Sequence, residues 1–224
     1  MSNLTVEQLA KYVDHTVLKP TATYDAVKQL CAEAAEYKFA SVCVNPCFIK
    51  LSADLLKGSG VKVCTVIGFP LGANTSDIKA AEAAQAVELG AEEVDMVINI
   101  DAAKSGDWER VEADIKAVVD AVHEGICVKV ILETCYLGKA EIVKACDASK
   151  AAGACFVKTS TGFGTVGATV EDVALMKETV GDCMKVKASG GVRSYEDALA
   201  MIEAGADRLG TSSGIAIIKS AEQA

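Results

Sequence analysis

Short apolar runs rich in Val, Ile and Cys alternate along the chain with longer segments of helical period. Runs of this kind are typical of β-strands, and their continuous apolar character is typical of parallel strands that are covered on both faces. Seven strands are predicted in this way, at residues 41–44, 61–67, 93–98, 127–132, 155–158, 185–187 and 208–210.

Helix signals occupy the intervals between these runs. Asp107 has the position and chemistry of an N-cap, because the apolar residues that follow it repeat with helical spacing. Thr169 and Ser194 each stand three positions before an Asp, which is the spacing of a capping box. Three of the predicted helices end in Gly-Ala directly before a strand, at 90–91, 153–154 and 205–206, where glycine can adopt the left-handed conformation that stops a helix.

The strand–helix repetition leaves two architectures open, a closed barrel and an open doubly wound sheet. An eighth short strand at residues 13–16, before a helix that begins near Tyr24, brings the number of strand–helix units to eight. No low-complexity or charge-rich linker divides the 224 residues. We therefore favour an α/β fold, a (β/α)8 TIM barrel that forms a single domain over residues 1–224.

The net charge of −9 argues against nucleic acid and against an anionic membrane as partners, since both require a basic face. No stretch approaches the ~18 continuous apolar residues of a membrane span. The first residues, Met1 to Leu9, lack a basic segment followed by an apolar run, so no signal peptide is expected. A cytoplasmic location is the expectation that follows.

Nine cysteines raise the question of disulfides or a metal site. They contain no C-x-x-C pair, and the only two histidines, His15 and His123, do not stand beside them in the sequence. Most of them lie inside apolar runs, as expected of buried free thiols in a reducing compartment. We expect no metal and no disulfide.

Function in a barrel is concentrated where strands end and the loops to the next helices begin. The charged residues at those ends are Asp14, Asp95, Glu133, Lys158 and Lys187. A single lysine at a strand end is ordinarily a side chain that extends to solvent at the sheet rim, and Asp95 could equally be a buried partner for a lysine.

Two lysines on neighbouring strands favour a chemical role. Like charges that are held close together and partly desolvated lower the pKa of one amine, so that a neutral nucleophile becomes available. Lys158 and Lys187 stand at the ends of the sixth and seventh predicted strands, which adjoin in a barrel. This pattern predicts Schiff-base chemistry on a carbonyl, with Asp95 moving protons.

Two glycine-rich turns follow the last two strands, at Gly190-Gly191 and at Gly210-Thr211-Ser212-Ser213. Barrels commonly hold a phosphate between these loops and a helix N-terminus, although both could be simple tight turns. The segment 162–167 matches G-x-G-x-x-G, but a dinucleotide site also needs an acid about 20 residues later, and that place holds Lys187. We therefore favour a phosphate site and set the dinucleotide site aside.

Several segments, in the same order along essentially the whole chain, resemble those of the deoxyribose-phosphate aldolases. They are Asp14-His15-Thr16-Val17-Leu18-Lys19-Pro20, Val44-Asn45-Pro46, Val66-Ile67-Gly68-Phe69-Pro70-Leu71-Gly72, Glu93-Val94-Asp95-Met96-Val97, Lys129-Val130-Ile131-Leu132-Glu133-Thr134, Val157-Lys158-Thr159-Ser160-Thr161-Gly162-Phe163, Val186-Lys187-Ala188-Ser189-Gly190-Gly191-Val192-Arg193 and Gly210-Thr211-Ser212-Ser213. The loop after Phe163 departs from the pattern, because Val166 stands where relatives often carry a glycine.

The resemblance implies a class I aldolase without metal or cofactor, which reversibly cleaves 2-deoxy-D-ribose 5-phosphate into acetaldehyde and glyceraldehyde 3-phosphate. It implies that Lys158 forms the Schiff base, Lys187 tunes it and Asp95 transfers protons. It also implies a homo-oligomer, dimer or tetramer, that acts in deoxynucleoside breakdown. The residues expected to bind the substrate and its phosphate are Thr159, Gly162, Gly190, Gly191, Gly210, Ser212 and Ser213, with Asp14, Thr16, Leu18 and Glu133 as supporting residues.

Two other readings remain open from the sequence. Another phosphosugar barrel, either an isomerase or an aldolase with a different donor, would share the phosphate turns. A non-catalytic phosphosugar-binding barrel would need the turns but not Lys158.

Overall fold

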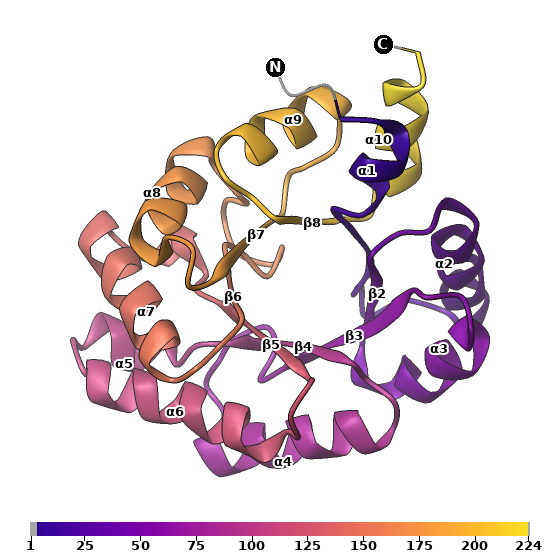
Figure 1. Cartoon of the computed structure of the whole chain (residues 1–224). Coiled ribbons are helices and arrows are strands. Elements are labelled where there is room, and N and C mark those ends of the chain that lie inside the picture. The colour runs from indigo at the N-terminus through magenta and orange to yellow at the C-terminus, as the bar shows by residue number, and fades with distance from the viewer. Residues whose placement is uncertain (1–3, 224) are drawn as a thin grey trace.

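Eight parallel strands close into a barrel in the computed structural model, which describes residues 4–223. The strands follow one another around the barrel in sequence order, and β1 pairs with β8 through Val13 and Leu209 to close it (Figure 1). Their bounds are β1 Val13–Val17, β2 Ser41–Val44, β3 Lys62–Ile67, β4 Glu93–Val97, β5 Cys127–Ile131, β6 Phe156–Lys158, β7 Lys185–Ser189 and β8 Arg208–Thr211.

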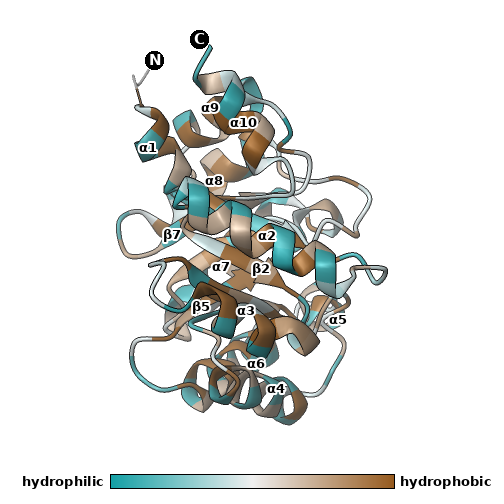
Figure 2. Ribbon diagram, turned by 90° about the vertical axis from the view of Figure 1, so that its right-hand side faces the viewer, coloured by the Kyte–Doolittle hydropathy of each residue, from teal (hydrophilic) through white to brown (hydrophobic). Residues whose placement is uncertain are grey.

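Helices form the outer layer around these strands, and Figure 1 shows them as a ring outside the barrel. Along their ribbons, apolar and polar residues alternate (Figure 2), as expected of helices with one face on a core and the other in solvent. Their bounds are α1 Val6–Ala10, α2 Tyr24–Tyr37, α3 Ile49–Leu56, α4 Ser76–Glu88, α5 Ile100–Lys104, α6 Trp108–Ala121, α7 Lys139–Ala151, α8 Val170–Val180, α9 Tyr195–Glu203 and α10 Gly214–Ala221, with short 3-10 helices η1 Pro46–Phe48 and η2 Thr134–Tyr136.

The predicted fold class is confirmed. All eight predicted strands form, and no strand end differs from the prediction by more than two residues. The predicted helix caps also form: Asp107, Thr169 and Ser194 each accept a hydrogen bond from the backbone N–H three residues on. Glycine ends three helices as predicted, with φ of 109° at Gly90, 85° at Gly153 and 108° at Gly205.

The expectation of continuously apolar strands is wrong for several strands, among them β1, β4 and β5. In β4 the apolar Val94 and Met96 pack in the core shared with the helices, whereas Glu93 and Asp95 between them are buried in ion pairs. Successive residues of a strand point to opposite faces, so the charged residues face the barrel interior. The physical reason is that this part of the barrel interior holds a group of paired charges.

No helix within residues 4–223 combines the length and apolar character needed to cross a bilayer.

Gly72 makes a close approach that positions the loop after β3 against the end of β4. Its φ is +69°, and a Cβ at this position would lie 1.9 Å from the carbonyl oxygen of Ile98. Gly106 has a similar φ of +75°, but no heavy atom lies within 4 Å of the place where its Cβ would be. A comparison of the two glycines therefore distinguishes the cost of a left-handed backbone from the cost of a clash with a neighbouring atom.

We expect Gly72→Ala to lower the free energy of unfolding more than Gly106→Ala. The left-handed conformation costs an L-residue roughly 1–2 kcal/mol in both variants, and only Gly72→Ala must also displace the Ile98 carbonyl. Urea unfolding of the two variants and the parent measures the difference. Equal losses would show that the contact with Ile98 relaxes without cost.

Candidate functional site

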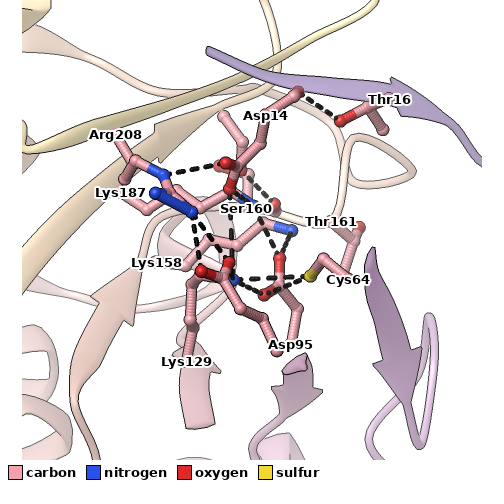
Figure 3. Close-up of polar contacts among 12 residues, drawn as sticks. Asp14, Thr16, Cys64, Asp95, Lys129, Lys158, Ser160, Thr161, Lys187 and Arg208 are labelled. Atoms are coloured by element: carbon pink, nitrogen blue, oxygen red, sulfur yellow. Dashed lines mark hydrogen bonds and ion pairs between the residues drawn. The ribbon is translucent and has the colours of Figure 1, made fainter. Parts of the chain in front are cut away.

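The carboxylate of Asp95 lies inside the barrel with three lysine ammonium groups around it (Figure 3). Its Oδ2 is 2.7 Å from Lys158 Nζ and 2.8 Å from Lys187 Nζ, and its Oδ1 is 2.9 Å from Lys129 Nζ. Asp95, Lys129 and Lys187 are fully buried, and Lys158 is 3% exposed. The structure thus brings the three predicted catalytic residues together at one carboxylate.

Strand register explains why the two predicted lysines meet. Lys158 on β6 is the direct neighbour of Lys187 on β7, and Val157 is the neighbour of Val186. Because side chains alternate between the two faces of a sheet, paired residues of adjacent strands point to the same side. Both lysines therefore enter the interior at the same level and reach the same oxygen of Asp95.

A second layer of charges compensates the lysines. Asp14 Oδ2 is 2.5 Å from Lys187 Nζ, and Asp14 Oδ1 accepts from Arg208 Nε at 2.8 Å. Glu93 Oε2 is 2.6 Å from Lys129 Nζ and also accepts from the Arg208 guanidinium at 2.8 Å. We call these two residues, with Asp95, the three lysines and Arg208, the charge cluster.

The charge cluster fixes the protonation states of its members. Burial alone would raise the pKa of Asp95, but the ammonium groups of Lys129, Lys158 and Lys187 outweigh it and hold that pKa well below the ordinary 3.8. Burial alone would lower the pKa of Lys187, but Asp14 and Asp95 raise it above the ordinary 10.5. Asp95 is therefore a carboxylate and Lys187 a fixed positive charge at neutral pH.

Three members of the charge cluster were not singled out as site residues from the sequence: Lys129, Glu93 and Arg208. Lys129 stands between Val128 and Val130 in the middle of a buried strand, which is a rare place for a lysine. Such a position, read together with the alternation of strand side chains, was the signal that could have placed Lys129 in the interior.

Glu133, predicted as a supporting residue, joins the loop after β5 to the loop after β6. Its backbone has a left-handed φ of 54°. Its carboxylate accepts a hydrogen bond from the N–H of Thr161 at 3.2 Å and another from the Thr161 hydroxyl. Glu133 therefore orients the loop that follows Lys158 through Thr161, and it is not a partner of Asp95.

Three of the predicted phosphate-binding glycines have a left-handed backbone, and the fourth, Gly210, lies in β8. Gly162, Gly190 and Gly191 have φ of 88°, 79° and 87°, and no heavy atom lies within 4 Å of a Cβ placed on Gly162 or Gly191. A Cβ on Gly210 would approach Ser189 Cβ at 2.8 Å and Lys187 Cε at 3.1 Å. Gly210 therefore lets Ser189 and Lys187 approach β8 closely, whereas Gly162 and Gly191 leave open space beside their backbone.

The N-terminus of α10 supplies further donors. Ser213 is its N-cap and makes no side-chain capping bond, and Ser212 is exposed just before it. By helix geometry the first N–H groups of α10 have no partner inside the helix, so they are available to an anion.

Thr159, predicted to bind substrate, contacts the backbone of Ser189. It is fully buried, and its hydroxyl donates to the Ser189 carbonyl at 3.1 Å and accepts from the Ser189 N–H at 3.0 Å. The hydroxyl thus joins the ends of β6 and β7 and is not free for a substrate. Its predicted role in binding stays a prediction, and the observed contacts give it a positioning role.

Thr16 and Leu18 lie at the end of β1. The Thr16 hydroxyl donates to the Asp14 carbonyl at 2.8 Å, which orients the strand end beside the charge cluster. Leu18 is buried with Cys43, Cys64 and Val66, and Phe69 packs against them. We call these five residues the apolar patch.

The apolar patch touches the charge cluster through sulfur. Cys64 Sγ is 3.1 Å from Asp95 Oδ1 and 3.4 Å from Lys129 Nζ (Figure 3). Ligand atoms of Cys43, Cys64 and Asp95 all lie within 4.8 Å of one another. The sequence did not suggest this grouping, because the three residues are far apart along the chain and come together only through the barrel.

The sequence of the chain is similar to that of a known family of enzymes. Residues 8–220 match the model of a family described as DeoC/LacD family aldolase. The chain belongs to the DeoC/LacD aldolase family. The resemblance predicted from the sequence is thereby confirmed.

Individual members of the DeoC/LacD family match over nearly the full chain. The deoxyribose-phosphate aldolase of Streptococcus sanguinis is 63% identical over 96% of this chain and 97% of its own length. The deoxyribose-phosphate aldolase of Caldanaerobacter subterraneus is 61% identical over 94% of this chain and 92% of its own. Among solved structures, the tetrameric deoxyribose phosphate aldolase from Aeropyrum pernix superimposes with a TM-score of 0.91 at 38% identity, covering 97% of this chain and 92% of that one.

The charge cluster makes stability depend on pH in a defined direction. Burial alone would raise the pKa of Asp14, but Lys187, Lys129 and Arg208 together lower it below the ordinary 3.8. A carboxylate whose pKa is lower in the folded than in the unfolded state stabilises the fold above its unfolded pKa. That contribution is lost as the pH falls toward the folded pKa.

We therefore expect Asp14→Asn to flatten the acid side of the stability curve. Between about pH 5 and pH 3 the free energy of unfolding of the parent should fall more steeply than that of the variant, because the variant has no carboxylate to protonate at this place. The variant should also be less stable at neutral pH, since Lys187 and Arg208 lose a counter-charge. Urea unfolding at several pH values measures both, with the exposed Asp25→Asn as matched control; parallel curves for parent and Asp14→Asn would contradict the expectation.

Proposed function

We propose that the chain catalyses the reversible cleavage of 2-deoxy-D-ribose 5-phosphate into acetaldehyde and D-glyceraldehyde 3-phosphate, through a Schiff base on Lys158. The observation that carries this proposal is the sharing of Asp95 Oδ2 by Lys158 and Lys187 inside the barrel, at 2.7 and 2.8 Å. The names of the relatives support the choice of substrate, since two of them at 61% and 63% identity are deoxyribose-phosphate aldolases.

Lys158 is the proposed nucleophile because it is the least buried of the three lysines around Asp95. It is 3% exposed, whereas Lys129 and Lys187 are fully buried and each holds a second carboxylate, Glu93 and Asp14 respectively. Lys158 has Asp95 as its ion-pair partner and stands directly before the loop that begins with Thr159. An amine that gives up its proton to Asp95 or to water can then attack the sugar aldehyde.

The reaction can be written with the residues of the site. The neutral amine of Lys158 adds to the C1 carbonyl of the open-chain sugar, and uptake of a proton with loss of water gives the protonated imine. A base then removes the proton of the C3 hydroxyl, the C2–C3 bond breaks, and its electron pair moves into an enamine on Lys158 as glyceraldehyde 3-phosphate leaves. Protonation at C2 and addition of water release acetaldehyde and restore the amine.

Asp95 is the proposed proton carrier in these steps. It lies next to the nucleophile and is ionised at neutral pH, because its pKa is held well below the ordinary value. General acid–base groups contribute ~10²–10⁴-fold to a rate. Lys129 keeps the carboxylate oriented through Oδ1, so that Oδ2 remains directed at Lys158.

The phosphate of the substrate is proposed to bind at the turns of Gly190, Gly191 and Gly210 and at Ser212 and Ser213 before α10. Backbone N–H groups there are oriented by open glycines and by a helix N-terminus without a side-chain cap. Gly162 in the loop after β6 lies beside Gly190 and completes the same rim.

The biological setting is proposed from the family. We place the enzyme in the cytoplasm, in the breakdown of deoxynucleosides, and we expect a homo-oligomer, either dimer or tetramer. The tetrameric relative from Aeropyrum pernix supports the latter.

Borohydride reduction in the presence of acetaldehyde tests the nucleophile. An imine between Lys158 and acetaldehyde becomes a stable secondary amine on reduction, so intact mass should increase by one ethyl group and peptide mapping should place it on Lys158. Lys158→Leu should show no addition, and Lys185→Leu, which alters an exposed lysine on β7, should react as the parent does. An adduct on Lys187, or none at all, would overturn the assignment and return the isomerase and binding-protein readings.

A pH profile of kcat/KM tests the role of Lys187. If its fixed charge keeps the neighbouring amine neutral, Lys187→Leu should move the acidic limb of the profile to higher pH, and raising the pH should partly restore the rate. Lys158→Leu should show no such restoration, because the nucleophile itself is missing. Lys185→Leu serves as the control on the same strand, and a limb that stays in place while only amplitude falls would mean that Lys187 acts by direct contact with substrate or water.

A further inference from the structure

Two thiols and one carboxylate converge in the barrel interior from three consecutive strands. Cys43 on β2 is the direct strand neighbour of Cys64 on β3, and Cys64 Sγ is 3.1 Å from Oδ1 of Asp95 on β4. All three residues are fully buried, and their ligand atoms lie within 4.8 Å of one another. Figure 3 shows the Cys64 sulfur directed at the Asp95 carboxylate.

These separations are close to those of a tetrahedral soft-metal site. Bond lengths of about 2.3 Å to sulfur and about 2.0–2.2 Å to oxygen place neighbouring ligand atoms roughly 3.6–3.8 Å apart. The Cys64–Asp95 pair is already slightly closer than this, and the widest pair must contract by no more than about 1 Å. Rotation of the two cysteine side chains suffices for a change of this size, because both sulfurs stand on single χ1 bonds.

We propose that Cys43, Cys64 and Asp95 form a binding site for one thiophilic divalent cation of the zinc class. Binding replaces the two S–H protons by two metal–sulfur bonds, and Asp95 Oδ1 supplies the third ligand. The two protons leave to solvent, so the dication and the two thiolates add no net charge to the interior.

The surroundings favour a soft cation over a hard one. Lys129 Nζ lies 3.4 Å from Cys64 Sγ, a position from which it can donate a charge-assisted hydrogen bond to a metal-bound thiolate. Leu18, Val66 and Phe69 pack with the two cysteines, and their apolar side chains offer no oxygen to a cation such as Mg²⁺ that keeps its waters. Thiolate ligands select zinc-like cations over the oxygen-seeking Mg²⁺ and Ca²⁺.

Occupation of this site has a consequence that rests on the proposed function. A cation on Oδ1 displaces Lys129 from Asp95 and so removes the contact that keeps Oδ2 directed at Lys158 for proton transfer. The bound cation is therefore an inhibitor, and its removal by a chelator restores the enzyme. Binding itself is independent of the reaction, so the two claims can fail separately.

The experiment measures binding in a background without exposed thiols. Cys47, Cys155 and Cys183 are the exposed cysteines within residues 4–223, and all three are replaced by Ser to remove adventitious ligands. Zn²⁺ affinity is measured by competition with a chromophoric chelator, and Cd²⁺ is added to observe the ultraviolet thiolate charge-transfer band. We expect one equivalent of either cation to bind, with excess Mg²⁺ unable to compete.

Single substitutions then identify the ligands. Loss of an outer-shell partner alone costs ~10–100-fold in metal affinity, so Cys43→Ser and Cys64→Ser, which remove a ligand with little change in size, should each weaken binding by more than ~100-fold. Cys146→Ala, at another buried free thiol on α7, is the matched control and should bind as the background does. Circular dichroism of every variant confirms that the barrel is folded.

Three results would overturn the proposal: a background protein that binds no Zn²⁺, binding that survives both serine substitutions, or equal loss in the Cys146→Ala control. The imine test on Lys158 does not depend on any of these outcomes, so it separates a failed metal site from a failed aldolase assignment.

Discussion

A carboxylate that is fully removed from water, with three ammonium groups around it, is the constraint on which the rest of this barrel depends. Burying a charge is costly unless a partner compensates it, and breaking one member of a buried pair is strongly destabilising. Asp95 is compensated by lysines from β5, β6 and β7, and those lysines are compensated in turn by Asp14 from β1 and Glu93 from β4. The register of the strands and the charge cluster therefore hold each other in place.

The charge cluster also carries a net positive charge. It contains four cationic side chains, Lys129, Lys158, Lys187 and Arg208, and three carboxylates, Asp14, Glu93 and Asp95, which leaves one positive charge (4 − 3) in the interior of a chain whose net charge is −9. A local positive field within an acidic protein draws an anionic substrate to one place and repels it elsewhere. The apolar patch adjoins the charge cluster, with members on β2 and β3 and just after β1 and β3, so the interior is divided between charge and sulfur-rich apolar surface.

Much of this arrangement could be predicted from the sequence, because local rules decide it. Strand runs, helix caps such as Asp107 and Ser194, and the glycines that end helices follow from local propensity, and the structure confirms them. Lys158 ends its strand as the same reasoning predicted, whereas Asp95 and Lys187 lie in the middle of β4 and β7 and not at their ends. Once the barrel closes, the side chains of Lys158 and Lys187 meet at the carboxylate of Asp95.

The remainder depended on three-dimensional neighbours that a sequence does not give. Lys129 and Glu93 became site residues because strand alternation turns them inward, and the partners of Thr159 were set by the approach of β7. The grouping of Cys43 with Cys64 depends on the register of β2 and β3, which no spacing along the chain reveals. Pairing across the barrel, and not residue type, was the missing information in each case.

The contact between Gly167 and Gly190 has a mechanical consequence. A Cβ on Gly167 would lie 2.1 Å from the Gly190 carbonyl oxygen, and the next residue, Ala168, donates its N–H to that oxygen at 2.9 Å. Ser189 reaches back from β7 to the Ser160 carbonyl at 2.6 Å. The loops after β6 and β7 are thus joined by two contacts and shift together. If the phosphate binds at the Gly190 turn as proposed, it also positions the loop that follows Lys158 before any bond to carbon is made.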